Sequence, residues 1–160
     1  MATGDTLAVF TPQHNEPPAS GEAKLDLRNE QPVLDFAAAA GEAAIFSGVL
    51  PAHYAGGGLT VEIAWAATSA TSGGVDWSAA FERHAEDDAD LDADNFGAAA
   101  TGSDNAPSSS GMLRYTQLAI DSGDMDNAQA GEHFRLKVSR GAGDSLAGDA
   151  ELVSVELREA

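Results

Sequence analysis

The chain has no cysteine and only 8 lysine and arginine residues among 160. Without cysteine it can form no disulfide, thiolate metal site, iron–sulfur cluster or cysteine nucleophile. Against 26 acidic residues, the 8 basic ones leave a formal net charge of −18. Proteins that bind nucleic acid place basic side chains on phosphates, and anionic membrane surfaces repel a polyanion. We therefore expect neither nucleic acid nor a membrane as a partner.

Long hydrophobic runs are also missing. No segment approaches the roughly 18 apolar residues that a membrane-spanning helix needs. Residues 1–18 contain no lysine or arginine and no apolar stretch of signal-peptide length. The sequence therefore predicts a soluble protein without a targeting segment.

Short runs with apolar residues at every second position are the main structural signal. The clearest covers residues 59–65, where Leu59, Val61, Ile63 and Trp65 share one face. Glycine-rich and Asp/Ser-rich turns separate the runs, and no window of 12 or more residues shows a helical period. The predicted strands are residues 24–28, 32–36, 43–50, 59–65, 75–83, 112–120, 134–139 and 152–157, with a weaker one at 96–101. We expect an all-β, antiparallel, jelly-roll-like β-sandwich of about eight strands.

The first 20 residues predict an extended arm ahead of a single domain at 21–160. Three prolines in residues 11–18 exclude a central strand there, because proline lacks the amide donor. The apolar residues just before them would dock on the arm's own domain or on a neighbour. The candidate interface residues of the arm are Leu7, Val9, Phe10, Pro12, Pro17 and Pro18.

Motifs for catalysis or cofactor binding are absent from the sequence. The histidines (His14, His53, His84 and His133) are far apart, with no pair at i, i+2 or i, i+4, and no Gly-x-Ser-x-Gly motif occurs. We expect no enzyme, no catalytic residue, no cofactor and no metal ligand.

An acidic run covers residues 86–94. Alternate aspartates can wrap a calcium ion, but an EF-hand loop starting at Asp88 would have Ala93 where glycine is required and Ala99 where glutamate is required. We interpret the run as a solvated loop after the strand at 75–83, and a weak calcium site of another kind remains open.

Trp65 and Trp77 lie on the apolar face of their predicted strands, which places them in the core. Tyr54, beside three consecutive glycines, is the better candidate for an exposed aromatic.

The basic residues Arg135, Lys137 and Arg140 gather on or beside one predicted strand, and the first two share its outer face. They either pair with acids on neighbouring strands, such as Glu151, or form a cationic strip that meets an acidic surface in an assembly. All three are candidate interface residues.

Several segments resemble the capsid decoration (cement) proteins of tailed bacteriophages, as in Phe46-Ser47-Gly48-Val49-Leu50-Pro51. Further segments of this kind are residues 15–19, 26–36, 56–61, 65–70, 130–138 and 149–152, so the likeness spans most of 11–158. The resemblance implies a small jelly-roll virion protein on the outer capsid surface, present as a homotrimer. It would cement contacts between copies of the major capsid protein, which would be its partner. The alternative is a trimeric, tail-associated knob that binds a glycan receptor.

Overall fold

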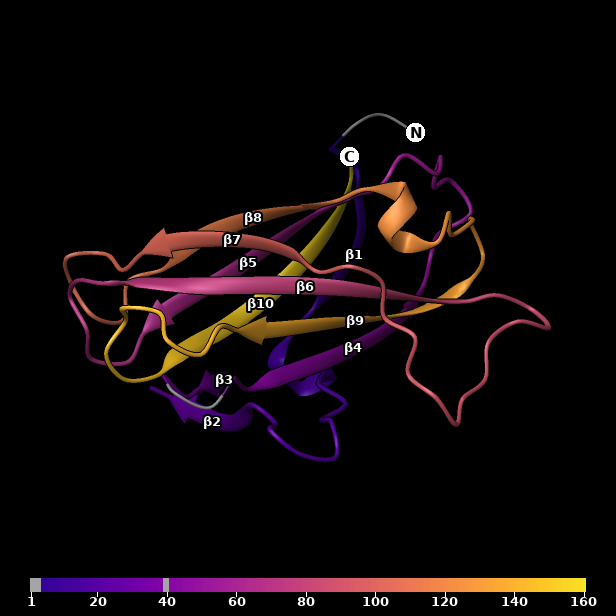
Figure 1. Ribbon diagram of the computed structural model, residues 1–160. Helices are drawn as coiled ribbons and strands as arrows, with labels where there is room; N and C mark the ends of the chain where they lie inside the picture. Colours follow the sequence, from indigo (N-terminus) through magenta and orange to yellow (C-terminus); the bar gives the residue numbers. More distant parts are fainter. Residues whose placement is uncertain (1–3, 39–40) are drawn as a thin grey trace.

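Ten β-strands form two antiparallel sheets in the computed structural model, which describes residues 4–38 and 41–160 (Figure 1). The first sheet contains β1 (Thr6–Phe10), β2 (Lys24–Arg28), β3 (Gln31–Phe36), β5 (Leu59–Ala67), β8 (Arg114–Ile120) and β10 (Ala150–Glu159). The second contains β4 (Ala43–Val49), β6 (Gly74–His84), β7 (Ala100–Asn105) and β9 (His133–Arg140). Their orders are β2-β3-β10-β5-β8, with β1 also on β10, and β4-β9-β6-β7. The predicted all-β, jelly-roll-like sandwich is confirmed.

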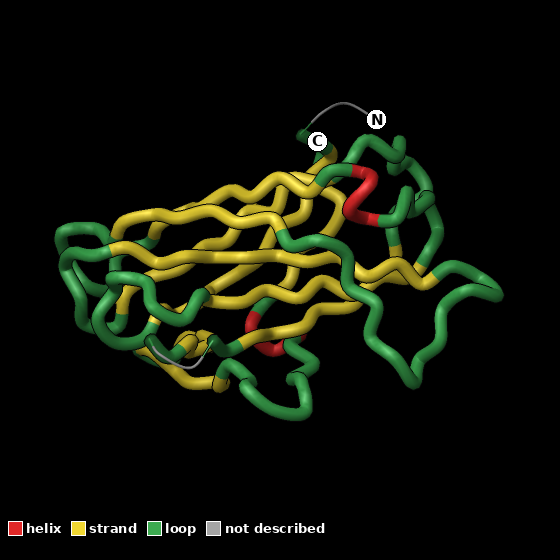
Figure 2. Tube along the Cα trace, viewed as in Figure 1, coloured by secondary structure: helices red, strands yellow, loops and turns green. Residues whose placement is uncertain are grey.

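Loops gather at the two ends of the sandwich (Figure 2). Two of them contain a short 3-10 turn, η1 (Pro12–His14) and η2 (Ser122–Met125). The connection from β6 to β7, residues 85–99, projects from one end (Figure 1) and carries the acidic run on its exposed side, as predicted. Within the described residues, no helix has the length and apolar character of a membrane span.

The core lies between the sheets and follows the period-2 pattern of the strands. Trp65 and Trp77 are buried there, with their rings in a T-shaped pair at 6.2 Å between centroids. The prediction that both are core residues is confirmed. The prediction of an exposed Tyr54 was wrong: it is buried, and its hydroxyl accepts from the backbone amide of Gly58 and lies 3.7 Å from Met125 Sδ.

Four phenylalanines connect the N-terminal strand β1 to this core. Phe10 stacks on Phe46 at 5.3 Å and meets Phe134 edge-on at 6.3 Å, and Phe134 stacks on Phe81 at 5.1 Å. The cluster joins β1 of the first sheet to three strands of the second. It compensates for the small size of the many alanines, because each aromatic ring buries a large apolar area.

The segment 6–23 runs along the sandwich rather than away from it. β1 pairs with the last part of β10, while β3 pairs with its first part, so both lie along one side of the same strand. After η1, the amide of Glu16 donates to the carbonyl of Ile45, and the amide of Ile45 donates to Asn15 Oδ1. The chain thus crosses from the first sheet to the edge of the second, and its apolar tip docks on its own domain.

Candidate functional site

The outward side of the four-stranded sheet is polar along much of its length. Core residues occupy alternate positions of β6 and β9, so the side chains between them point away from the sandwich. The outward polar residues are Ser47 on β4; Asp76, Ser78, Glu82 and His84 on β6; Thr101 and Ser103 on β7; and His133, Arg135, Lys137 and Ser139 on β9. We call this surface the four-strand face.

Glu82 organises one end of the four-strand face. Its side chain is only 2% exposed, and Oε1 accepts from Arg135 at 3.1 Å and lies 2.6 Å from His84 Nε2. Burial raises the pKa of Glu82, but hydrogen bonds from the Asn95 backbone amide, His84 and Arg135 outweigh it and hold the pKa below its ordinary value. The carboxylate therefore stays charged and ties the 85–99 loop to the sheet.

Phe96 and two cations form the middle of the face. The guanidinium carbon of Arg135 lies 5.2 Å from the Phe96 ring centroid, and Lys137 Nζ lies 5.9 Å from it. Arg135 also donates to Asp94 at 2.8 Å, so its charge is balanced by Glu82 and Asp94. The ring from the loop thus rests beside two basic side chains, an arrangement that cation–π attraction favours.

Hollows adjoin the four-strand face on both sides of this centre. One of about 260 Å³ lies between the 85–99 loop and the end of β6, with Glu82, Asp94 and Asn95 in its wall. Another of about 410 Å³ is lined by Ser78, Thr101 and their neighbours Asp76, Trp77, Gly102, Ser103 and Gly141. Hydroxyl, carboxylate and amide groups thus line spaces large enough for small polar ligands.

The fold brings two histidines together that the sequence separates. His84 and His133 are directly opposite each other on β6 and β9, with ring centroids 5.0 Å apart. Burial, and then the neighbouring His84, lower the pKa of His133, so its ring is neutral at pH 7. In residues 4–38 and 41–160, no three histidine or acidic side chains converge as metal ligands.

The six-stranded sheet also has an outward side. Tyr115 on its edge strand β8 is 59% exposed there. On β3, Asp35 lies opposite Glu151 of β10, and its buried Oδ1 has no hydrogen-bond partner within the described part of the chain. Burial, followed by the charges of Glu151, Asp26 and Asp149, raises the pKa of Asp35 to about 6.

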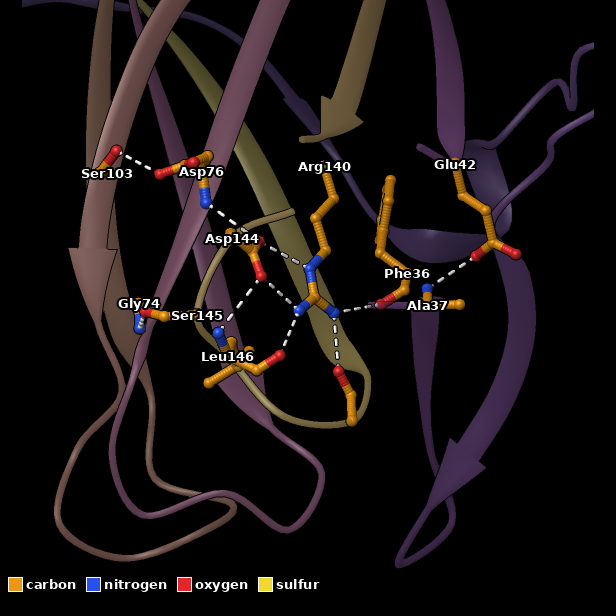
Figure 3. A network of polar contacts seen from close by, with 11 residues as sticks. Phe36, Ala37, Glu42, Gly74, Asp76, Ser103, Arg140, Asp144, Ser145 and Leu146 are labelled. Carbon is orange, nitrogen blue, oxygen red and sulfur yellow. Dashed lines mark hydrogen bonds and ion pairs between the residues drawn. The ribbon is translucent and has the colours of Figure 1, made fainter. Parts of the chain in front are cut away.

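Arg140, a candidate interface residue, is instead fully buried at the end of β9 (Figure 3). Two of its nitrogens donate to the Asp144 carboxylate at 2.8 and 2.7 Å. The other contacts are to the carbonyls of Phe36, Gly148 and Leu146, at 2.8, 2.7 and 2.7 Å. With five hydrogen bonds, the guanidinium has no remaining donor for a partner and joins three loop and strand segments of its own domain.

The other candidate interface residues are scattered. Arg135 and Lys137 lie on the four-strand face, and Arg135 pairs with Glu82 and Asp94 instead of Glu151, which binds Arg28. Of the arm residues, Phe10 and Pro12 are buried, Leu7 and Pro18 are partly buried, and Val9 and Pro17 are exposed. The structure therefore does not bring these nine residues together into one surface.

Comparison with known proteins gives matches in structure alone. No family model and no curated protein matches the sequence. A carbohydrate-binding module of Cellvibrio mixtus lichenase 5A, solved with cellotriose, matches with a TM-score of 0.56 at 13% identity over 97% of this chain and 98% of its own. The CBM22-1 xylan-binding domain of Paenibacillus barcinonensis gives 0.53 at 15% identity, over 100% and 99%. A family 11 module of Clostridium thermocellum, solved with a mixed-linked tetrasaccharide, gives 0.51 at 10% identity, over 100% and 98%. At these identities, the likeness establishes the fold.

These findings overturn the resemblance to a phage capsid decoration protein. The three solved structures described above share the fold over its full length, and all three are carbohydrate-binding modules, not capsid proteins. The expected role in cementing a capsid was therefore wrong. The major capsid protein as partner and the homotrimer rested on the same resemblance and are corrected with it.

Proposed function

We propose that this protein is a carbohydrate-binding module that holds an oligosaccharide on its four-strand face without cleaving it. The observation that carries the proposal is this open face, where hydroxyl, carboxylate and amide groups line hollows of about 260 and 410 Å³. The end-to-end structural match to carbohydrate-binding modules supports it, because the whole sandwich is shared.

The chemistry of the four-strand face suits sugar hydroxyls. Each hydroxyl is both a donor and an acceptor, and Ser78, Ser139 and Thr101 offer the same dual capacity. Asp76, whose Oδ1 accepts from Ser103 Oγ at 2.5 Å, adds an acceptor at the edge. A strand of eight residues such as β9 is about 26 Å long, which is enough for an oligosaccharide of several units.

The carboxylates of the face favour binding over hydrolysis. A glycosidase needs one carboxylic acid with a raised pKa opposite a second carboxylate. Glu82 has a lowered pKa and is already engaged by Arg135, His84 and Asn95, so it is held as an anion and cannot serve as a general acid. The face can therefore orient a sugar chain, and we assign it no hydrolytic step.

A pair of blocking variants tests the site. Ser139→Trp places an indole in the middle of the four-strand face, and Gln117→Trp places the same group outward on the six-stranded sheet. Binding is first measured with the wild-type chain by calorimetry against a panel of plant and microbial oligosaccharides. For a ligand found there, we expect Ser139→Trp to weaken binding at least tenfold and Gln117→Trp to leave it within twofold.

The reverse result would place the ligand on the six-stranded sheet beside Tyr115, and the proposed face would be wrong. If the wild-type chain binds no member of the panel, the proposed function itself is refuted. Unchanged thermal unfolding of both variants serves as the folding control.

A further inference from the structure

We infer that the four-strand face is selective for an acidic sugar, whose anionic group binds Lys137. This inference rests on the proposed function and adds the class of ligand. It comes from which basic side chains form ion pairs and which do not. All eight basic residues lie in the described part of the chain.

All six arginines are paired with acids. The pairs that hold them are Arg28–Glu151, Arg83–Glu132, Arg114–Asp104, Arg135–Glu82, Arg140–Asp144 and Arg158–Glu62. Neither lysine has such a pair: within residues 4–38 and 41–160, no carboxylate lies within 4.0 Å of Lys24 or Lys137.

The two lysines differ in their surroundings. Lys24 is exposed at the start of the edge strand β2. Lys137 is half-buried in β9, with Ile45 of β4 on one side and Ala80 of β6 on the other. Neither neighbour can accept a hydrogen bond through its side chain, and the Phe96 ring lies 5.9 Å from Nζ. Lys137 is therefore held at the centre of the face with its charge unmatched.

An anionic sugar supplies what this position lacks. An ammonium and a carboxylate attract each other as opposite charges, whereas a neutral hydroxyl offers the ammonium only a dipole, so a uronate gains more here than a neutral hexose does. Ser78 and Ser139 form the next outward-facing pair after Ala80 and Lys137 on the same two strands. Their hydroxyls can bind the ring hydroxyls of the same sugar unit. Acidic groups dominate the surface and repel an anion, so the unpaired ammonium of Lys137 is the favoured point of attachment on this face.

The test uses two variants that change the net charge equally. Lys137→Gln and Lys24→Gln each remove one positive charge and change the net charge from −18 to −19, so they alter long-range repulsion alike. Calorimetry compares an oligogalacturonate with the same oligosaccharide after its carboxyl groups are reduced to neutral alcohols. We expect the wild-type chain to bind the uronate at least tenfold more tightly than the reduced form. Lys137→Gln should abolish that preference, and Lys24→Gln should retain it.

The outcomes separate this inference from the proposed function. A wild-type chain that binds the reduced oligosaccharide as well as or better than the uronate overturns the inference while the proposed function stands. Equal loss of preference in both variants also overturns it, because bulk charge would then be the cause. If neither sugar binds and the wider panel is also silent, the proposed function fails and the inference fails with it. A sulfated galactan oligosaccharide in parallel distinguishes a carboxylate from a sulfate ester as the preferred anion.

Discussion

Arg140 and Asp144 form a bidentate ion pair that is buried from solvent, because their side chains are 0% and 1% exposed. The carboxylate has further donors in the backbone amides of Asp76 and Leu146, at 3.2 Å each. Burial raises the pKa of Asp144, but these hydrogen bonds and the Arg140 charge hold it below its ordinary value. The pair thus joins the loop after β9 to β6 and to the end of β3 (Figure 3).

Replacing Arg140 should therefore be costly. Arg140→Gln leaves the Asp144 carboxylate and three carbonyls without their donor, and removal of one partner from a buried pair costs about 3–5 kcal/mol. The matched control is Arg114→Gln, because the Arg114–Asp104 pair is 3.8 Å long and substantially exposed. It should lose less than about 1 kcal/mol. Urea denaturation measures both, and equal losses would contradict a structural role for the buried pair.

Phe10 should contribute far more to stability than its neighbour Val9. Phe10 is 6% exposed and packs on Phe46 and Phe134, whereas Val9 is 55% exposed. We expect Phe10→Ala to lower the free energy of unfolding by about 3 kcal/mol and Val9→Ala by less than about 0.5 kcal/mol. Urea titrations of the two variants provide the measurement. Similar small losses would mean that β1 is not docked in solution.

Asp35 should make the chain less stable as the pH rises. Its pKa is raised from 3.8 to about 6 by folding, so the folded chain holds the proton more tightly than the unfolded chain does. Stability linked to this group is complete below about pH 4 and is lost as the pH rises to about 6. Asp35→Asn removes the cost of ionisation. Because Asp35 is partly exposed and solvent screens its neighbours, we expect a gain on the order of 1 kcal/mol at pH 7.5, or about 2–4 °C in Tm.

The same substitution should give no gain at pH 4, where Asp35 is already protonated. Asp92→Asn in the exposed 85–99 loop removes the same unit of charge and serves as the control. If both variants gain the same stability at pH 7.5, the cause is the change in net charge and not the raised pKa of Asp35.

Gly73 and Gly56 offer a test of backbone contact. Both have positive φ, +88° and +91°, so alanine is strained at either position. A Cβ on Gly73 would lie 2.4 Å from the carbonyl oxygen of Ser145, whereas one on Gly56 would meet nothing within 4 Å. We expect Gly73→Ala to lower Tm at least twice as much as Gly56→Ala. Equal decreases would show that the loop carrying Ser145 moves aside.

The sequence predicted the strands best where one face is buried. Leu59 to Trp65 and Val75 to Phe81 alternate because each strand has a core side and a solvent side. β7 was placed four residues too early, at 96–101, because this edge strand is polar and its actual span, Ala100–Asn105, has little apolar pattern. β1 went unpredicted as a strand because its partner, β10, lies at the other end of the chain.

The candidate site depends on contacts that no local pattern reports. Glu82 and Arg135 are 53 residues apart and meet only because β6 and β9 are neighbours in one register. The outward position of Arg135 and Lys137 was predicted correctly from alternation. By the same alternation Arg140 points inward with Phe134 and Val138, but its charge suggested a surface role, and its carbonyl partner on Phe36 lies 104 residues away.

The pairing of β1 with β10 determines how the fold responds to mechanical tension. Gly4 donates to the carbonyl of Glu159 at 2.8 Å, and Thr6 lies opposite Arg158, so the outer ends of both strands start from the same corner. A force that pulls these two ends apart acts across the strands, so the β1–β10 hydrogen bonds break one after another. In a shear geometry, all of these hydrogen bonds would carry the force at the same time. Phe10, opposite Val155, is the last residue of β1 to separate. The four-stranded sheet contains neither of these ends, so peeling at low force begins on the other sheet. It reaches the four-stranded sheet when Phe10 leaves its contacts with Phe46 and Phe134.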